Sequence, residues 1–227
     1  MPVRSSLRER IKIKVSIVIT NYNYAKYLNR SIRSAFVQDF PENEYEIIVV
    51  DDSSSDWSKE IMDSYGQFIV PVFFKKNVGL AAARNAGIKK AKGEYILFLD
   101  ADDYLNKNII KLESLFLDFN PEWDAVACDY WLVDDNEETI GRNSCMEQPI
   151  ACGIMFRKQR LSDIGMYDKN FKMWEDKDLR IRFLKKYNIN RIEIPLYRYR
   201  QHSNNMTKDN EKDKIFTEKL LKKHDKK

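Results

Sequence analysis

The sequence predicts an α/β protein with a mostly parallel central sheet and helices on both faces. The first observation is alternation: short apolar runs at 15–20, 46–50 and 95–99 are separated by segments in which apolar residues recur at helical spacing. The second is that these runs are continuously apolar, which is typical of strands buried on both faces of a parallel sheet. The two patterns together predict a layered α/β domain.

Each element of the first hundred residues follows from its own pattern. Pro71 places the third strand at a sheet edge or at the start of that strand, because proline cannot donate to the ladder. Lys92-Gly93 ends the alanine-rich helix before the fourth strand, since glycine is a common stop signal. The predicted strands are 15–20, 46–50, 69–74 and 95–99, and the predicted helices are 25–37, 58–65 and 80–91.

The rhythm changes after Asp103. A turn is expected at 133–136, and the region up to residue 150 reads as irregular or hairpin-like, so a smaller antiparallel region follows the parallel one. The other expected elements are helices at 107–119, 158–164 and 176–187 and strands at 125–132 and 191–196.

Length and composition bound the class of protein. A chain of 227 residues and 27.0 kDa can bury one substantial core. We expect one domain over 14–207, between a basic N-terminal extension (1–13) and a basic C-terminal tail (208–227). No apolar run approaches the roughly 20 residues that span a bilayer, and the charged start is unlike a signal peptide. The three cysteines lack metal-binding spacing, which predicts reduced thiols in a cytoplasmic protein.

The C-terminal tail is expected to place Ile215, Phe216 and Leu220 along one helical side. Such a basic helix could lie on an anionic membrane surface, dock on a neighbouring domain or stay solvated. These alternatives leave open a peripheral contact with the cytoplasmic face of a membrane. Nucleic acid is not an expected partner, because the basic residues form no stripe interleaved with aromatic residues.

Three carboxylates, Asp100, Asp102 and Asp103, follow the apolar run 95–99 where a buried strand is expected to end. Clustered carboxylates raise one another's pKa and destabilise a fold unless a cation neutralises them. Oxygen ligands of this kind suit Mn²⁺ or Mg²⁺, commonly shared with substrate phosphates. Helix capping by Asp102 or Asp103 is the alternative. The cluster favours a divalent metal site.

Polar residues also follow the first two strands, at 20–23 and 51–56. In an open parallel sheet, ligands bind beyond the carboxyl ends of the strands. Tyr22 offers a base a stacking face, and Asp51 or Asp52 can accept hydrogen bonds from a base or ribose. Singly, residues 51–56 could be an Asx turn and a helix cap. With the acidic cluster, they predict a nucleotide diphosphate across the strand ends.

Arg84 lies in the small-residue segment 77–87, which predicts a helix that approaches the sheet or a ligand closely. Its guanidinium could face a phosphate or an acidic partner. A tightly packed helix with one structural arginine is an equally good interpretation.

Glu175 and Asp176 precede an expected helix, and Trp174 stands before them. Asp176 is either a helix cap or a general base, with Trp174 as an apolar wall for a sugar. His202, which follows the last strand, is the only histidine in the body of the chain. It is a candidate metal ligand or diphosphate contact, and the alternative is a structural histidine.

The ordered set of segments closely resembles the family 2 inverting glycosyltransferases of GT-A (Rossmann-like) fold, over roughly 14–207. One departure is a serine in the loop after Asp51-Asp52, where glycine is common. The segments that carry the resemblance are 16–23, 49–56, 77–79, 83–85, 99–103 and 174–176.

The resemblance implies a nucleotide-sugar donor, a divalent metal, and single displacement onto a hydroxyl of a glycan or lipid-linked acceptor. The base would be bound by Thr20, Tyr22 and Asp52, which favours UDP-sugars over GDP- or CMP-sugars, with Asp51 close by. Asp100 would contact ribose and metal, and Asp102 and His202 the metal. Asp176 would be the catalytic base, and Trp174 and Glu175 would contact acceptor or sugar. The acceptor surface is expected between residues 124 and 171.

Two other functions fit part of this sequence pattern. A haloacid-dehalogenase-like phosphatase also has a strand followed by Asp-x-Asp, but Tyr104 stands where that motif needs threonine or valine. A non-catalytic sugar- or nucleotide-binding module would fit the same fold, because fold does not fix function. The presence of both Asp102 and Asp176 favours an enzyme.

Overall fold

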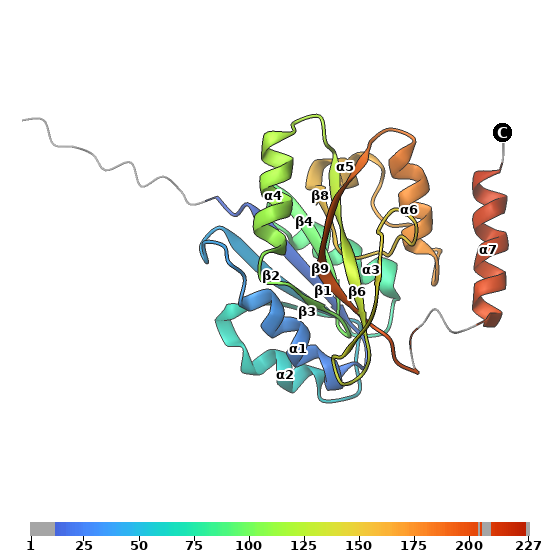
Figure 1. Ribbon diagram of the computed structural model, residues 1–227. Helices are drawn as coiled ribbons and strands as arrows, with labels where there is room; N and C mark the ends of the chain where they lie inside the picture. The colour runs from blue at the N-terminus through green and yellow to red at the C-terminus, as the bar shows by residue number, and fades with distance from the viewer. Residues whose placement is uncertain (1–11, 204, 206–209, 226–227) are drawn as a thin grey trace, which may run out of the picture.

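The computed structural model describes residues 12–203, 205 and 210–225 (Figure 1). Nearly all of the expected N-terminal extension therefore lies outside the described residues. The described chain forms one α/β domain around a nine-stranded sheet whose order is β3-β2-β1-β4-β8-β6-β9-β5, with β7 paired to β6. The predicted fold class is confirmed.

Four parallel strands form the first half of the sheet, as the apolar runs predict. Their order is β3-β2-β1-β4, which puts β3, the strand that carries Pro71, at the edge of the sheet. The strands β1, β2 and β4 are buried over almost their whole length. The bounds are β1 (Val15–Asn21), β2 (Tyr45–Asp51), β3 (Val70–Phe73) and β4 (Tyr95–Asp100).

Antiparallel pairs join the second half of the sheet to the first. β8 is antiparallel to both β4 and β6, and β5 and β7 are antiparallel to β9 and β6, while β6 and β9 run parallel. The sequence analysis did not predict β5 or β8, and β9 is twice its expected length. The bounds are β5 (Tyr104–Leu105), β6 (Ala125–Val133), β7 (Thr139–Asn143), β8 (Ile154–Arg157) and β9 (Ile189–Arg200).

Helices cover both faces of the sheet, with α1, α2 and α4 on one side and α3, α5 and α6 on the other (Figure 1). The small residues of α3 allow close approach: a Cβ at Gly87 would lie 2.2 Å from Val18 Cγ1 of β1. The bounds are α1 (Ala25–Phe36), α2 (Ser58–Ser64), α3 (Leu80–Lys90), α4 (Ile109–Phe119), α5 (Lys158–Asp163), α6 (Glu175–Leu184) and α7 (Asn210–His224), with a short 3-10 helix η1 (Gly66–Phe68).

The three cysteines are buried free thiols. Burial raises the pKa of each of them, so they pack as apolar side chains. Among the described residues, no helix is both long and apolar enough to cross a bilayer.

Candidate active site

The candidate site lies at the carboxyl ends of β1, β2 and β4. In the register of the sheet, Asn21 lies beside Asp51, and Thr20 lies beside Asp100. The Thr20 hydroxyl donates to Asp100 Oδ1 at 3.3 Å. The structure therefore brings together polar residues that follow three strands far apart in the sequence.

Side-chain hydrogen bonds join the loops after β1 and β2. Asn21 Nδ2 donates to Asp51 Oδ1 at 2.8 Å and to the Ser54 hydroxyl at 3.1 Å. That hydroxyl also accepts from the backbone N–H of Asn23 at 2.9 Å. Asp51 is thus buried and structural in its contacts, whereas Tyr22 between the loops is 46% exposed. The Tyr22 ring is free to stack on a ligand from this edge.

Ser53, in the loop after β2, has a φ of 66°, in the left-handed region that favours glycine. This geometry gives a physical reason for glycine in such loops, since a side chain there costs about 1–2 kcal/mol.

Asp52 binds the loop that leads into α3. Its two carboxylate oxygens accept backbone N–H groups from Val78 at 2.8 Å and from Gly79 at 2.7 Å. Gly79 has a φ of 93°, so this loop conformation favours glycine. Each oxygen retains a second lone pair, and the predicted contact of Asp52 with a base stays a prediction.

Arg84 lies at the centre of the site and is 1% exposed. Its Nη2 donates to Asp100 Oδ1 at 2.9 Å, and its Nη1 donates to Glu175 Oε1 at 2.7 Å. Burial opposes the charge, but the carboxylates of Asp100 and Glu175 hold the pKa of Arg84 well above its usual value. Of the alternatives for Arg84, the structure shows the acidic partner, and there are two of them; its predicted role in nucleotide binding stays a prediction.

Glu175, expected to contact acceptor or sugar, instead lies buried against Arg84. Burial, opposed by Arg84 and reinforced by the neighbouring Asp176, raises the pKa of Glu175 to about 7. The Arg84–Glu175 pair joins α6 to α3 across 91 residues of sequence. Through the contact of Arg84 with Asp100, it also ties α6 to the end of β4.

Asp102 and His202 form the second part of the acidic edge. His202 Nε2 lies 2.9 Å from Asp102 Oδ2, and the imidazole stacks on the Tyr27 ring at 5.1 Å between centroids. Of the three predicted metal ligands, the structure brings Asp102 and His202 together, while Asp100 faces Arg84. Within the described residues, no three histidine, cysteine, aspartate or glutamate side chains converge on one point.

Asp103 turns away from this edge into the core. It accepts from the Tyr197 hydroxyl at 2.6 Å and from the backbone N–H of Arg200 at 2.8 Å. Burial, with the charges of Asp102 and Asp100, raises the pKa of Asp103 well above its usual value. Asp103 therefore anchors the acidic loop to β9.

Trp174 and Asp176 mark the start of α6. Trp174 adopts the left-handed conformation, with a φ of 63°, and its indole N–H is buried without a hydrogen-bond partner among the described residues. Backbone strain of this kind is concentrated at functional sites. Asp176 is partly exposed, and its carboxylate accepts no hydrogen bond in the described chain.

Sequence reasoning missed three residues that shape the acidic edge. Tyr24 and Tyr27 border the His202 ring, and Arg200 Nε donates to the backbone carbonyl of Asp102 at 2.8 Å. Burial, together with Asp102 and Asp100, raises the pKa of Tyr24. The three-residue spacing of the two tyrosines, which puts them on one helical face, was the available signal.

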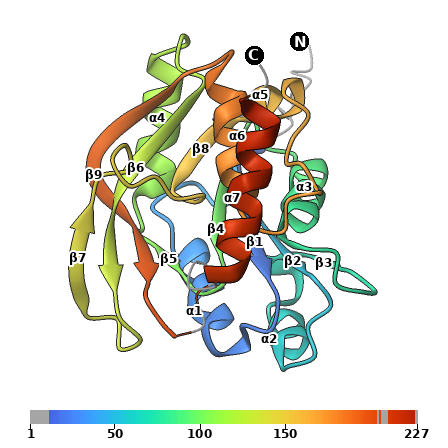
Figure 2. The same ribbon diagram turned by 90° about the vertical axis from the view of Figure 1, so that its right-hand side faces the viewer.

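The C-terminal helix α7 docks on α6 of the same chain (Figure 2). Lys223 Nζ lies 2.6 Å from an oxygen of the fully buried Asp178 and 2.8 Å from Asp168, and His224 Nε2 lies 2.8 Å from Asp178. The tail therefore docks on α6 of its own domain, and not on a neighbouring domain as one of the alternatives had it. Membrane contact stays a prediction.

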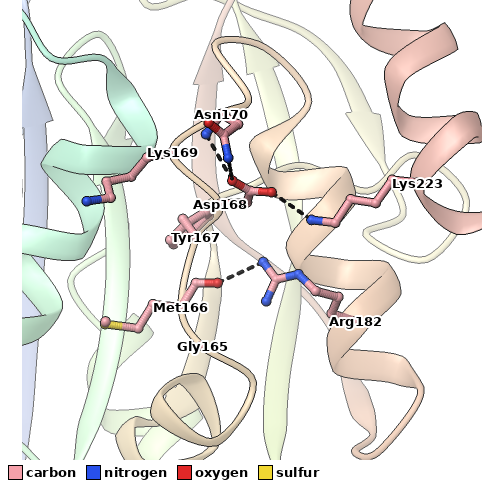
Figure 3. A pocket seen from close by; sticks show the side chains of 8 residues that line it. All are labelled: Gly165, Met166, Tyr167, Asp168, Lys169, Asn170, Arg182 and Lys223. Carbon is pink, nitrogen blue, oxygen red and sulfur yellow. Dashed lines mark hydrogen bonds and ion pairs between the residues drawn. The ribbon is translucent and has the colours of Figure 1, made fainter.

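A shallow pocket of about 410 Å³ opens between the loop before α6 and α7 (Figure 3). Asp168, Arg182 and Lys223 line it, and each is already engaged by neighbouring protein groups. The strand-end residues do not line this pocket.

Comparison with known proteins places this geometry in a family. The model of "Glycosyl transferase family 2" matches residues 16–185. The chain is 37% identical over 109 residues to poly(ribitol-phosphate) beta-N-acetylglucosaminyltransferase TarS of Staphylococcus aureus, covering 47% of this chain and 19% of that protein. It is 36% identical over 140 residues to cholesterol galactosyltransferase of Borreliella burgdorferi, covering 61% and 38%. The chain thus spans well under two thirds of these relatives.

Solved structures agree in fold. TarS of S. aureus in complex with UDP-GlcNAc superposes with a TM-score of 0.76 at 23% identity, over 92% of this chain and 67% of that chain. The mannosyltransferase PcManGT of Pyrobaculum calidifontis, in complex with GDP-Man and Mn²⁺, superposes with a TM-score of 0.68 at 16% identity. The match covers 85% of this chain and 58% of that chain. With most of its length matched by the family model and its fold shared with these structures, the chain belongs to glycosyl transferase family 2 and has the GT-A fold.

Proposed function

We propose that this chain is an inverting glycosyltransferase that moves a sugar from a UDP-sugar to a hydroxyl of a glycan or lipid-linked acceptor. Single displacement needs a base on the face of the sugar opposite the leaving diphosphate. Asp176 is our candidate base, with a divalent metal assisting departure of the diphosphate.

The observation that carries the proposal is the connection from the strand ends to Asp176. Asp100 and Glu175 both bind Arg84, so the residue next to Asp176 is fixed to the donor edge. The Asp176 carboxylate has no hydrogen-bond partner of its own among the described side chains and is partly exposed. A carboxylate held by its neighbour but free at its oxygens suits a base that takes a proton from an acceptor hydroxyl.

The donor is proposed from the strand-end loops. The exposed Tyr22 ring would stack on the base, and Thr20 and Asp52 would contribute polar contacts at its edge. The TarS structures in complex with UDP-GlcNAc and with UDP support a uridine nucleotide. A thymine donor differs by one methyl group, which a pocket discriminates by only about 1–3 kcal/mol.

The metal is proposed from the chemistry of the Asp102–His202 pair. A carboxylate oxygen and an imidazole nitrogen 2.9 Å apart are two ligands for one ion, and Mn²⁺ or Mg²⁺ commonly takes its other ligands from substrate phosphates and water. These residues fit the ion. When bound, it would neutralise charge on the leaving nucleoside diphosphate.

The protein groups perform the remaining work. Asp176 accepts the acceptor hydroxyl's proton as the new glycosidic bond forms and the bond to the diphosphate breaks. Glu175 holds Arg84, and Arg84 in turn fixes the Asp100 carboxylate beside Thr20. The Trp174 ring would border the sugar, because sugar C–H faces pack on aromatic rings.

The test is Asp176→Asn, with Asp63→Asn as matched control. Asp63 is exposed on α2 and makes no side-chain contact in the described structure. Transfer should fall by about 10²–10⁴-fold in the Asp176 variant, the range for a lost general base. Its thermal shift with UDP and Mn²⁺ should stay that of the wild type. Wild-type transfer by Asp176→Asn, retention of anomeric configuration, or a clear preference for GDP over UDP would contradict the proposal.

A further inference from the structure

Arg180 of α6 is an arginine without a partner. Its guanidinium makes no hydrogen bond or ion pair with any residue that the structure describes, and its Nη1 is inaccessible to solvent. Three other arginines of the second half of the chain do have carboxylate partners: Arg182 binds Asp178, and both Arg142 and Arg191 bind Asp129. Burial lowers the pKa of Arg180. The Arg180 side chain is partly exposed as a whole, but an inaccessible Nη1 donor without a partner is costly, which points to a group that arrives with a ligand.

Its position places that ligand beside the proposed base. Arg180 follows Asp176 by four residues in α6, so the two side chains lie on one helical face, with about 5–6 Å between their Cβ atoms. Asp176 supports the charge of Arg180, and the Cys145 thiol also lies near the guanidinium. The Trp174 indole N–H, at the start of the same helix, is also buried without a partner among the described residues.

Among the described residues, no carboxylate forms an ion pair with Arg180 from the Cys145 side. The nearest acid there is Asp129, which accepts the backbone N–H of Cys145 at 3.2 Å. Its oxygens also bind Arg191 Nη2 at 2.8 Å and Arg142 Nη2 at 3.0 Å. One aspartate therefore serves two arginines, Arg191 and Arg142, before any contact with Arg180.

The direction of α6 places Arg180 away from the strand ends, where the nucleotide-sugar donor is proposed to bind. The helix starts at Glu175, which is bonded to Arg84 at the strand ends. At 1.5 Å per residue, Arg180 lies about one turn farther along the axis than Asp176. A group held there lies beyond the base, on the acceptor side, and not at the diphosphate.

We propose that Arg180 binds an anionic group of the acceptor, a phosphodiester or a carboxylate, close to the hydroxyl that Asp176 deprotonates. This specificity role rests on the proposed transferase function. A guanidinium suits it, because its planar fork donates two parallel hydrogen bonds to a phosphate or carboxylate. The contact would pair the inaccessible Nη1 donor and would select charged acceptors over neutral ones.

The experiment measures binding of three probes to the whole chain in the presence of UDP and Mn²⁺. Poly(ribitol phosphate) supplies phosphodiesters, an oligogalacturonate supplies carboxylates, and a dextran oligosaccharide supplies neither. The variants are Arg180→Gln and Arg180→Lys. Lys185→Gln is the matched control, since Lys185 is exposed at the end of α6 and has no side-chain contact in the described structure.

We expect the wild type to prefer one of the two anionic probes over dextran, and which one it prefers identifies the group. Arg180→Gln should weaken the binding of that probe by about tenfold, equal to about 1.4 kcal/mol of binding free energy. Arg180→Lys should be intermediate, and Lys185→Gln, dextran binding and UDP binding should be unchanged. The melting temperature of Arg180→Gln should not fall, because no partner is lost.

Three results would overturn this role. They are equal wild-type affinity for charged and neutral probes, unchanged anion affinity in Arg180→Gln, and weaker UDP binding in that variant. A lower melting temperature would make Arg180 structural and count against it too. Absence of UDP binding in the wild type would instead contradict the proposed function, so the two failures are distinguishable.

Discussion

Replacing Arg84 with methionine tests the link between the strand ends and α6. Arg84 and Glu175 have side chains that are 1% and 5% exposed, and their charged atoms lie 2.7 Å apart. Removing one partner of such a buried pair costs about 3–5 kcal/mol. Asp100 loses its contact as well, but its 28% exposed side chain leaves it in reach of water. Glu175 therefore dominates the loss.

The stability that Arg84→Met loses relative to the wild type should depend on pH. Burial raises the pKa of Glu175 to about 7, above the value of about 4.3 in an unfolded chain. Stability from this group is fully present below about pH 4.3 and is lost as pH rises through the folded pKa. Without the Arg84 charge, the pKa of Glu175 in the folded protein rises further. The Arg84→Met variant therefore goes on losing stability above pH 7, where the wild type no longer does. The deficit should be smallest near pH 5 and largest near pH 8.5.

Thermal unfolding followed by circular dichroism at these two pH values is the assay. At about 2–4 °C per kcal/mol for a chain of this size, the variant should melt about 6–20 °C below wild type at pH 8.5. Arg33→Met is the matched control, because Arg33 is exposed on α1 and its side chain forms no hydrogen bond or ion pair in the described structure. A pH-independent deficit, or a loss below about 1 kcal/mol, would refute this account of the pair.

Three further outcomes follow from other sites. Asp102→Asn should lower turnover about a hundredfold or more, as loss of one preorganised charge contact does; activity that survives EDTA would contradict a metal role. Glu113→Met should raise stability by about 1–3 kcal/mol, because Glu113 is fully buried and the weak donor of the Cys128 thiol is the one partner its carboxyl meets in the described structure. Burial raises the pKa of Glu113, so urea unfolding should show the gain growing from pH 5 to pH 8. Lys223→Met should speed amide exchange in α7 about tenfold; unchanged exchange would mean that its contacts with Asp178 and Asp168 do not hold the helix.

The first half of the fold was readable from the sequence because its strands are buried on both faces. β1, β2 and β4 consist of apolar runs, and each ends within two residues of its expected limit. β9 was predicted at half its length because polar Asn190 near its start and Arg198 and Arg200 at its end break the apolar pattern, and its register with β6 shifts near Pro195. Four-residue β8 gives too short a signal, and its antiparallel pairing with β4 depends on tertiary packing.

The site was predicted as a set of strand-end residues, and the contacts between them were not. Spacing alone presents Asp100, Asp102 and Asp103 as one acidic cluster. The structure separates them: Asp100 faces Arg84, Asp102 faces His202, and Asp103 enters the core against Tyr197. The separation depends on partners 16 to 100 residues away, which a local pattern cannot specify.

This separation has a chemical consequence for the proposed mechanism. Three like charges at one point would each resist ionisation, and a metal would have to bind before the loop could be stable. With Asp100 neutralised by Arg84 and Asp103 bonded to Tyr197, Asp102 and His202 are left, among the described residues, as the pair proposed to hold the metal. In the proposed mechanism the acidic loop therefore does not require the ion for its own charge balance, and the ion would arrive with the donor diphosphate. Arg84 also binds Glu175, the residue next to Asp176 in α6. The guanidinium that neutralises Asp100 therefore also fixes the start of the helix that bears the proposed base.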